Sequence, residues 1–550
     1  MTVGSEGGHG TVPGAEMLAT LLSAAGPTGS RPLGDLVSRL RSGGHLLSAQ
    51  PRLDELSGAA VTGIVYDSRQ IRPGSVFVAV PGAHADGHAF VAAAADGDAI
   101  AAIVERPVSG TTIAQLVVRD TRLALAVAAA WWYGDPSHSL GIVGITGTDG
   151  KTTTSFLATA VLEAAGISTG LITTAGLKVG GARFANPEHV TTPQAPELEQ
   201  LLAAMVVAGN SAAVVETTSH GLALGRVAAI AYDVAAFTNL THEHLELHGT
   251  FEAYRDAKLG LFRGLGTPRP TKQLARGWPR TAIVNLDDAA APHFLAAGRN
   301  AGARVFTYGL DAGAEVRATA IDEDEHRLRV DVATPRWRGP VRLQLAGRFN
   351  AHNALAALAI GEALDLLPDA IVSGLEGVAG VPGRMERIDR GQPFGVIVDY
   401  AHSPASLGKV LDILRPLAES RGGGLIAVFG SAGERDVAKR PMMGRVAGER
   451  CRLVVVTDED PRGEDNLAIL DQIATGAEAA GRRRGQDVLC VADRREAIAT
   501  AFGRAAPGDV VLLAGKGHEQ SIIMADGPHA WDERSEALAA LVRLGYEGLP

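Results

Sequence analysis

The segment GIVGITGTDGKTTT, residues 141–154, decides how this chain folds, because an apolar, β-rich run passes through a glycine-rich turn into a helix pattern. It fits G-x-x-G-x-x-G-K-T, with Ile145 standing where the strict phosphate-loop motif has its first glycine. Glycines let backbone N–H groups approach phosphate oxygens, and the N-terminus of the following helix adds its dipole. The segment therefore predicts a nucleotide site; the alternative is an ordinary glycine-rich turn with an exposed lysine.

Each residue of the predicted phosphate loop has a physical role. Lys151 would neutralise the β- and γ-phosphates, and the Thr152 hydroxyl would bind Mg²⁺. The loop residues expected to contact ATP are Gly147, Thr148, Gly150, Lys151, Thr152 and Thr153. Nucleotide binding alone leaves a kinase, a GTPase or a ligase open.

Strands and helices alternate outward from this loop. The apolar runs AAVVETT, DVAAFTN and TAIVNLD predict a mainly parallel sheet covered on both faces, and the runs after VPGRMER predict a second, doubly wound unit. We therefore predict an α/β fold with a mobile tail and three domains. These are residues 1–32 (tail), 33–139 (small N-terminal α/β domain), 140–382 (central P-loop domain with a parallel sheet) and 383–550 (C-terminal Rossmann-like domain).

Length and composition restrict the class of protein. The 550 residues suit about three domains, and a net charge of −10 argues against binding nucleic acid or an acidic membrane. No run approaches the roughly 18 apolar residues of a membrane span. The only cysteines, Cys451 and Cys490, lie in strand-like runs, so we expect core residues in a reducing cytoplasm. The segment GTPRPTKQLARGWPR, residues 266–280, is interpreted as a surface insertion.

An ordered set of further segments resembles the Mur ligase family and its folylpolyglutamate synthetase relatives. After the phosphate loop come ETTSHGL (216–222), TNLTHEHLELHG (238–249), FEAYRDAKLGLF (251–262), LAGRFNAHNALAA (345–357), VPGRMERI (381–388), VIVDYAHSPASL (396–407) and AGKGHEQ (514–520). Each segment alone is a weak signal, but their order is specific. The resemblance implies an ATP-dependent ligase that forms an amide bond through an acyl phosphate.

The resemblance also implies a metal-binding set around the nucleotide. Glu216 ends a predicted strand and would bind Mg²⁺, which prefers oxygen ligands; a solvated charge is the alternative. His244 matches the metal-ligand histidine of the family, in a segment where Glu243 and Glu246 stand in place of the usual aspartates. Lys258 matches a lysine that reacts with CO₂ to form a carbamate, a reaction that needs a neutral amine. A solvated lysine on an amphipathic helix is the alternative for Lys258.

The remaining nucleotide contacts implied by the resemblance come from two regions. Asn350 and Asn353 of GRFNAHN suit adenine or ribose. Arg384, Asp399 and His402 belong to the predicted C-terminal domain and would reach ATP when that domain closes as a lid.

The N-terminal segment YDSRQIRPGSVFVAVPGAHADGHAF, residues 66–90, resembles the UDP-binding segment of the MurE-type tripeptide synthetases of this family. Ser68 and Arg69 would contact uridine diphosphate, and Asp86 and Gly87 would shape the loop. The muramoyl dipeptide contacts implied by HVTTPQAPEL and TTSHGLALGRV are Thr191, Thr192, Ser219 and Arg226.

The incoming amino acid is expected in the C-terminal domain. Arg435 would hold its α-carboxylate, and AGKGHEQ supplies Gly515 and Glu519, of which Glu519 would accept from a distal ammonium. The family motif D-N-P-R reads Glu459-Asp460-Pro461-Arg462 here. Arg462 suits a second carboxylate, whereas the acid Asp460 disfavours one. These two signals conflict. We favour meso-diaminopimelate, and L-lysine and L-ornithine remain open.

The sequence thus predicts a cytoplasmic, monomeric ligase of peptidoglycan precursor synthesis. It would join a free diamino acid to the D-glutamate of UDP-N-acetylmuramoyl-L-alanyl-D-glutamate with ATP, Mg²⁺ and a CO₂-derived carbamate on Lys258. Nucleic acid and membrane insertion are not expected. The alternatives are a folylpolyglutamate-synthetase-like ligase and a P-loop ATPase that acts on a protein partner.

Overall fold

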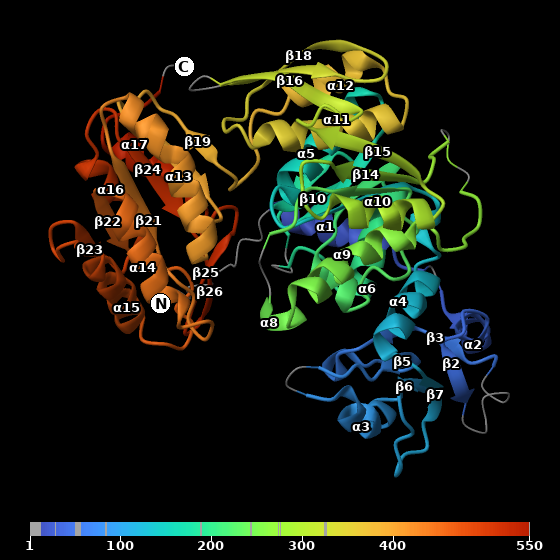
Figure 1. Ribbon diagram of the computed structural model, residues 1–550. Helices are drawn as coiled ribbons and strands as arrows, with labels where there is room; N and C mark the ends of the chain where they lie inside the picture. Colours follow the sequence, from blue (N-terminus) through green and yellow to red (C-terminus); the bar gives the residue numbers. More distant parts are fainter. Residues whose placement is uncertain are drawn as a thin grey trace, which may run out of the picture. The chain divides into compact units, whose positions relative to one another are not determined.

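The computed structural model describes residues 13–548 except 28, 50–56, 83–84, 187–189, 242–244, 273, 275–276 and 324–326. Its contacts divide the chain into two compact units (Figure 1). The first comprises Met1–Ile321, Val330–Val341 and Phe349–Gly377, and the second comprises Asp322–Arg329, Arg342–Arg348 and Val378–Pro550. No helix among the described residues is long and apolar enough to cross a membrane.

The N-terminal part of the first unit is a small α/β layer, as predicted. Its sheet has the order β2-β7-β6-β5-β4, in which β4 to β7 are parallel and β2 is antiparallel. Separate apolar clusters lie on the two faces of the sheet. The elements are β1 Arg31–Pro32, α2 Leu33–Ser42, β2 Leu46–Ala49, β3 Ala60–Val61, β4 Gly63–Val65, β5 Ser75–Val78, α3 Val91–Asp96, β6 Ala101–Val104, β7 Ala114–Val118 and α4 Thr121–Trp132.

The central sheet has the order β11-β10-β9-β12-β8-β13-β14-β15-β16-β17-β18, and β8, which leads into the phosphate loop, lies between β12 and β13. The pairings from β9 to β16 are parallel, which confirms the predicted parallel sheet. The strands are β8 Gly141–Thr146, β9 Thr169–Thr173, β10 Gly176–Val179, β11 Ala182–Phe184, β12 Ala212–Glu216, β13 Val234–Phe237, β14 Thr281–Asn285, β15 Arg304–Gly309, β16 Val316–Glu323, β17 Leu328–Ala333 and β18 Arg338–Leu343.

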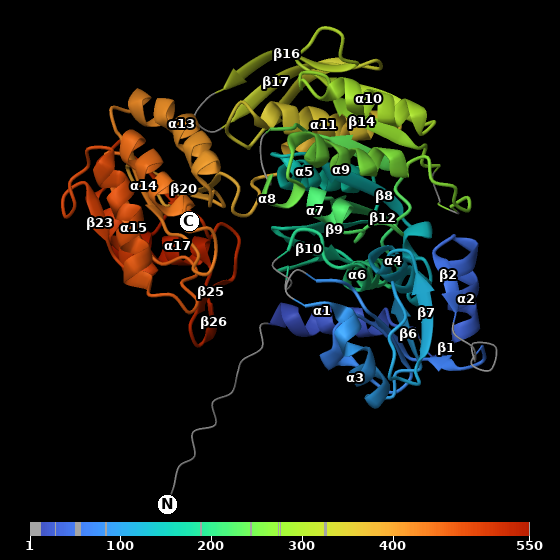
Figure 2. The same ribbon diagram turned by 60° about the horizontal axis from the view of Figure 1, so that its bottom comes forward.

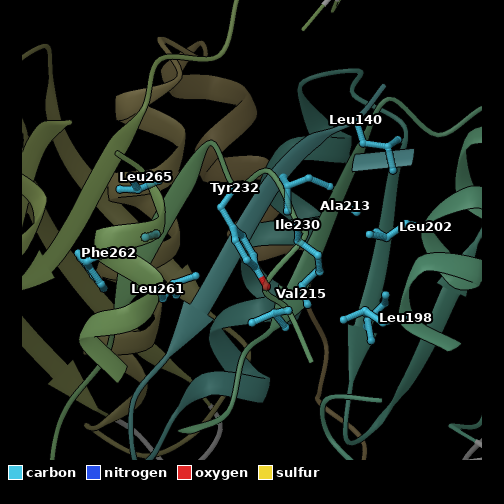
Figure 3. Close-up of a cluster of buried hydrophobic side chains, with 14 of the residues drawn as sticks. Leu140, Leu198, Leu202, Ala213, Val215, Ile230, Tyr232, Leu261, Phe262 and Leu265 are labelled. Atoms are coloured by element: carbon cyan, nitrogen blue, oxygen red, sulfur yellow. The ribbon is translucent and has the colours of Figure 1, made fainter. Parts of the chain in front are cut away.

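Helices cover both faces of the central sheet, as predicted (Figures 1 and 2). On one face α5, α11 and α12 pack together. On the other, α6, α9 and α10 supply the large apolar cluster of which Figure 3 shows Leu198, Tyr232 and Leu261. The helices are α5 Lys151–Ala164, α6 Ala195–Val207, α7 Ser219–Ala223, α8 Leu245–His248, α9 Phe251–Gly264, α10 Ala291–Asn300, α11 Asn350–Ala363 and α12 Pro368–Glu376.

Helix α9 shows how the sequence orients a site residue. Thr250 caps it by accepting a hydrogen bond from the Ala253 N–H at 3.1 Å. Its buried residues Tyr254, Lys258, Leu261 and Phe262 recur every three or four positions and so share one face. The periodicity that buries the apolar residues therefore also turns Lys258 inward.

The N-terminal segment departs from the prediction. Residues 13–24 form α1 Pro13–Ala24, which packs on α6, and the Gln200 amide donates to the Leu22 carbonyl at 3.1 Å. Leu18 and Ala25 belong to the large apolar cluster. The predicted mobile tail is wrong for this helix, because its apolar residues find a partner surface on α6. Residues 1–12 lie outside the described part of the chain.

The segment 266–280 is also more than a surface insertion. Arg269 and Lys272 donate to the buried carboxylate of Asp233 at 2.7 and 2.6 Å, and the Lys272 side chain is 5% exposed. The ring of Trp278 lies where a Cβ on Gly141 would stand, 2.3 Å from the nearest ring atom. Burying Asp233 requires such charged partners, so the surface interpretation is wrong for these side chains.

The second unit contains the predicted doubly wound sheet, in the order β19-β20-β24-β21-β22-β23, with β20 to β23 parallel. Helices α13, α14 and α15 cover one face, and α16 and α17 cover the other. Cys451 is buried, but Cys490 is exposed at the end of β23, so the core prediction is wrong for it. The elements are β19 Glu386–Ile388, β20 Gly395–Asp399, α13 Pro404–Ser420, β21 Leu425–Phe429, α14 Lys439–Arg450, β22 Leu453–Val456, α15 Asn466–Ala479, β23 Val488–Cys490, α16 Arg494–Arg504, β24 Val510–Ala514, β25 Ser521–Met524, β26 Gly527–Ala530 and α17 Glu533–Arg543.

Candidate nucleotide and ligase site

The phosphate loop has a backbone that only glycine fits at two positions. Gly147 and Gly150 have φ angles of 151° and 81°. A Cβ on Gly147 would stand 1.9 Å from the Thr238 hydroxyl, and one on Gly150 would stand 2.2 Å from the Asn353 side-chain oxygen. Positive φ and close approach together exclude other side chains. Such a turn, placed between β8 and α5, is typical of a phosphate-binding backbone.

The cations and hydroxyls of the loop face inward. The Lys151 ammonium donates to the Thr148 carbonyl at 2.7 Å, so this lysine folds back over the loop and is not fully exposed. The Thr148 hydroxyl lies 3.1 Å from the Tyr254 hydroxyl, and Thr153 is buried in the first turn of α5. Lys151 is therefore only partly exposed, unlike the exposed lysine of the plain-turn alternative.

Thr152 and Glu216 form the oxygen pair that a hard cation needs. Glu216 ends β12, is 2% exposed and accepts from the Thr152 hydroxyl at 3.0 and 3.1 Å. The Thr174 N–H also donates to this carboxylate, at 3.3 Å. The parallel strands β8 and β12 are neighbours, which brings the loop and Glu216 to the same sheet edge. The alternative of a solvated strand-end charge is thus wrong for Glu216.

Lys258 reaches the same loop from α9. Its ammonium donates to the Gly147 carbonyl at 2.6 Å and lies 4.4 Å from the centre of the Tyr254 ring. The residue is 1% exposed, so it is not the solvated lysine of an amphipathic surface. His244 and Glu243 lie outside the described residues, and so does the side chain of Glu246.

The predicted adenine or ribose contacts lie at the start of α11. Asn353 donates to the Asn350 side chain at 2.9 Å and accepts from the Thr154 hydroxyl of α5 at 3.3 Å. Both asparagines are buried. Helix α11 therefore places two amides beside the phosphate loop.

The predicted muramoyl dipeptide residues surround the end of β12. The Thr192 hydroxyl donates to the Glu216 carbonyl at 3.0 Å, and Arg226 donates to the Thr192 carbonyl at 2.8 Å. The Thr191 hydroxyl lies 2.6 Å from that of Thr174, and Ser219 is buried in the first turn of α7. Polar groups thus continue from the phosphate loop along one edge of the sheet.

The predicted UDP residues lie in the small N-terminal layer. Arg69 is exposed and pairs with Asp67 at 2.6 Å, and Ser68 begins the short helix between them. Asp86 accepts from the His88 backbone and pairs with Arg106, and these bonds hold the pKa of its carboxyl well below the usual range. A Cβ on Gly87 would stand 2.6 Å from the Val80 nitrogen. Asp86 and Gly87 therefore shape this loop, as predicted.

In the second unit, Arg384, Asp399 and His402 lie around the end of β20. Asp399 accepts from the backbone N–H groups of Met385 and Ala401 at 2.8 and 2.9 Å. Burial raises the pKa of its carboxyl, and the charge of Arg384 opposes that rise. The Arg384 guanidinium lies 5.1 Å from the centre of the Tyr400 ring, and the His402 ring bonds the Tyr400 carbonyl at 2.9 Å.

The predicted amino-acid residues follow the carboxyl ends of β21, β22 and β24. A Cβ on Gly515, where φ is 100°, would stand 2.9 Å from a carboxylate oxygen of Glu459. That oxygen, Oε2, and the Nε of Arg462 are buried and lack a hydrogen-bond partner among the described residues. Arg435 is exposed in the loop after β21. A polar ligand or a water molecule would supply the missing partners of this acceptor and this donor.

The structure adds one residue that the sequence prediction missed. Lys516 is fully buried and donates to Asp460 at 2.8 Å and to Glu519 at 2.5 Å. The sequence analysis treated Asp460 as an acid that disfavours a carboxylate nearby. In the structure its charge is paired with that of Lys516. Lys516 lies within AGKGHEQ, but nothing in that segment shows which carboxylates it meets.

Comparison with known proteins matches three consecutive parts of the chain. Residues 60–132 match the Mur ligase family catalytic domain, residues 145–361 the Mur ligase middle domain, and residues 383–517 the Mur ligase glutamate ligase domain. The chain is 49% identical over 496 residues to UDP-N-acetylmuramyl-tripeptide synthetase of Roseiflexus sp. (strain RS-1), which covers 89% of this chain and 96% of that relative. The chain belongs to the Mur ligase family.

Two further similarities refine the place of this Mur ligase. It is 40% identical over 502 residues to UDP-N-acetylmuramoyl-L-alanyl-D-glutamate–2,6-diaminopimelate ligase of Geobacter metallireducens, covering 89% of this chain and 95% of that one. A solved structure of a ligase with the same name matches with a TM-score of 0.61 at 29% identity, covering 89% and 96%. The prediction of an ATP-dependent ligase of peptidoglycan synthesis is confirmed.

Proposed function

We propose that this Mur ligase joins meso-diaminopimelate to the D-glutamate carboxylate of UDP-N-acetylmuramoyl-L-alanyl-D-glutamate, with hydrolysis of ATP to ADP and phosphate. The observation that carries the choice of amino acid is that Oε2 of Glu459 and Nε of Arg462 are both buried without a hydrogen-bond partner among the described residues. A buried carboxylate oxygen without a donor suits an ammonium, and a buried guanidinium N–H without an acceptor suits a carboxylate. Diaminopimelate carries both groups at its distal centre, whereas lysine and ornithine carry only the ammonium.

The phosphate loop supports the first half of the reaction. The backbone N–H groups around Gly147 and Gly150 and the ammonium of Lys151 would bind the phosphates of ATP. Thr152 and Glu216 offer buried oxygen ligands that fit Mg²⁺, whose charge would offset that of the phosphates. The substrate carboxylate then attacks the γ-phosphorus, ADP leaves, and an acyl phosphate remains. Lys151 stabilises negative charge on the transferring phosphoryl group.

The second half needs little covalent work from the protein. A neutral amine of the diamino acid attacks the acyl carbon, the resulting tetrahedral centre loses phosphate, and the nitrogen loses a proton. Arg435 would hold the α-carboxylate, and Glu519 would accept from the distal ammonium. Positioning of two reactants in one site accounts for most of the rate.

We also propose that Lys258 carries a carbamate in the active enzyme. The neutral amine adds to CO₂ and loses a proton, so a cation becomes an anion that can support Mg²⁺. The support is its position, buried beside Gly147 and on the face of α9 turned toward the loop. His244 belongs to the same proposed metal set.

The substrate nucleotide is assigned to the first unit. Ser68 and Arg69 would contact uridine diphosphate, and Thr191, Thr192, Ser219 and Arg226 would contact the muramoyl dipeptide. The support is the polar run that links these threonines to Glu216. Asn350, Asn353, Arg384, Asp399 and His402 complete the proposed ATP contacts. The domain boundaries 33–139, 140–382 and 383–550, a monomeric state and a cytoplasmic location remain part of this proposal.

A comparison of amino acids tests the proposed specificity. ADP release is measured with the UDP-muramoyl dipeptide and meso-diaminopimelate, L-lysine or L-ornithine, for the wild type and Arg462→Ala. We expect diaminopimelate to be the best substrate. Arg462→Ala should lower its kcat/KM by about 30-fold or more, because a charge-assisted pair in a closed site is lost.

The lysine reaction is the internal control, because it needs no partner for Arg462. Arg462→Ala should change kcat/KM for lysine by less than about threefold. A wild type that uses lysine or ornithine and ignores diaminopimelate would reject the specificity proposal and leave the ligase assignment intact. ADP release that no amino acid stimulates would instead favour an ATPase with another partner.

A further inference from the structure

Lys516 is a buried cation held by two carboxylates in the second unit. Its side chain is 0% exposed, and its ammonium donates to Asp460 Oδ1 at 2.8 Å and to Glu519 Oε2 at 2.5 Å. Each carboxylate has one further donor. The Ile523 N–H donates to Asp460 Oδ1 at 2.9 Å, and the Tyr400 hydroxyl donates to Glu519 Oε1 at 3.1 Å. The three charged side chains therefore form one fixed network.

A different residue, Arg494, holds the ends of β22 and β24 near this network. Arg494 is fully buried, pairs with Glu533 at 2.7 Å, and donates to the carbonyls of Asp458 and Ala514 at 3.1 and 2.8 Å. These carbonyls follow β22 and end β24, so Arg494 joins the two segments that carry Asp460 and Lys516. Within the described part of the chain, the Lys516 ammonium bonds two carboxylates and no backbone carbonyl of either strand. Lys516 therefore bonds side chains of the proposed amino-acid site, Asp460 and Glu519, and does not hold the strands together.

Charge counting shows what Lys516 changes. At the distal end of the amino acid, with Arg435 assigned to the α-carboxylate, Glu459, Asp460 and Glu519 contribute three negative charges and Arg462 contributes one positive charge, which leaves −2 without Lys516 and −1 with it. A site of charge −2 would attract a lone ammonium strongly and would repel a carboxylate. Lys516 also engages Asp460 Oδ1, so the acid two residues before Arg462 is already paired.

We propose that Lys516 is a positioning residue that offsets the charge of Asp460 and so lets the site accept an amino acid with a zwitterionic distal centre. This inference rests on the proposed function, because it assigns the amino acid to these loops. It predicts a change in the choice between two substrates, which a merely structural lysine would not control. The ammonium of Lys516 does not touch the reacting atoms in this proposal.

The test is the ratio of kcat/KM for meso-diaminopimelate to that for L-lysine in Lys516→Met, which keeps the length of the side chain and removes its charge. We expect the ratio to fall about tenfold or more, mainly through a higher KM for diaminopimelate. The KM values for ATP and the UDP-linked substrate should stay within about twofold. Lys409→Met, at an exposed position of α13, is the matched control and should leave the ratio unchanged.

Two further variants keep the inference falsifiable if Lys516→Met does not fold. Asp460→Asn/Lys516→Met removes both charges and should restore most of the diaminopimelate preference. Asp460→Asn alone leaves Lys516 with one carboxylate, so the ratio should rise. A folded Lys516→Met that loses both amino acids equally, or an unchanged ratio in Asp460→Asn, would overturn the inference. A wild type that uses no diamino acid would instead overturn the proposed function, which the wild-type assay alone reveals.

Discussion

The phosphate loop of the first unit and the proposed amino-acid loops of the second unit are built by different means. The phosphate loop is built from backbone, with Gly147 and Gly150 in conformations that exclude a side chain. The amino-acid loops are built from charged side chains, of which Lys516 is paired with both Asp460 and Glu519. A site built from backbone is formed by consecutive residues, whereas a site built from side chains needs partners that are distant in the sequence. The two regions should therefore respond differently to substitution.

The largest effect is expected in the phosphate loop. Lys151→Ala removes the cation beside the β- and γ-phosphates and should lower ATP turnover by about a thousandfold or more. Among the described residues, the Lys151 ammonium bonds the loop carbonyl of Thr148 alone, so the melting temperature should change little. Turnover by coupled ADP release, with Lys409→Ala as the control, checks this. Near-normal turnover in a folded Lys151→Ala protein would remove Lys151 from the nucleotide site.

A slightly smaller effect is expected at Lys258. Its side chain reaches the phosphate loop by donating to the Gly147 carbonyl, so it tests what a charged side chain adds to a site built from backbone. Lys258→Ala should lower turnover by about a hundredfold, and a short carboxylic acid should restore part of it by replacing the missing anion. Lys258→Met fills the same space without charge, so it should be equally inactive and should not be rescued.

A direct measurement separates the carbamate from a simple cation. The wild type supplied with ¹³C-labelled bicarbonate should show a carbamate carbon signal that Lys258→Met lacks. A fully active wild type in CO₂-free buffer, without that signal, would contradict the proposal and leave Lys258 as an ammonium bound to Gly147.

The same contrast explains how far the sequence could be interpreted. The parallel sheets and the phosphate loop were predictable, because apolar runs, glycine spacing and a following helix are local signals. Helix α9 shows the limit of such signals. Its periodicity turns Lys258 inward, but the sequence does not show that the Lys258 ammonium donates to the Gly147 carbonyl at 2.6 Å.

In three places the sequence analysis missed a contact between residues that are far apart in the sequence. Asp460 seemed a lone acid because its partner, Lys516, is 56 residues away. The segment 266–280 looked like a surface loop because the acid that it neutralises, Asp233, lies in another part of the chain. Helix α1 looked mobile because its partner surface on α6 is formed by residues far along the sequence. The role of a charged residue or of an apolar helix face depends on the residues that it contacts, and these contacts are seen only in the folded chain.

The smallest expected effect tests the same contrast with a buried acid that has no cation bonded to it. Glu199 of α6 is 2% exposed, and its Oε2 has no hydrogen-bond partner among the described residues. Burial, with a contribution from the charge of Asp135, raises the pKa of Glu199 to about 8. In the second unit, by comparison, the buried Asp460 and Glu533 bond Lys516 and Arg494. The first unit therefore keeps Glu199 protonated at neutral pH.

A raised carboxyl pKa makes folding stability depend on pH in a defined direction. Below its unfolded pKa, near 4.5, Glu199 is neutral in both states and costs nothing. Between that pH and about 8 the unfolded chain releases the proton and the folded chain keeps it, so the free energy of unfolding falls as pH rises. Glu199→Gln removes this loss. The variant should match the wild type near pH 5 and be more stable by about 2–4 kcal/mol near pH 8. Urea unfolding at both pH values measures the difference, with Glu252→Gln at an exposed position of α9 as the matched control. A stability difference that is the same at both pH values would show that Glu199 is ionised in the folded protein, and that a cation compensates it as Lys516 compensates Asp460.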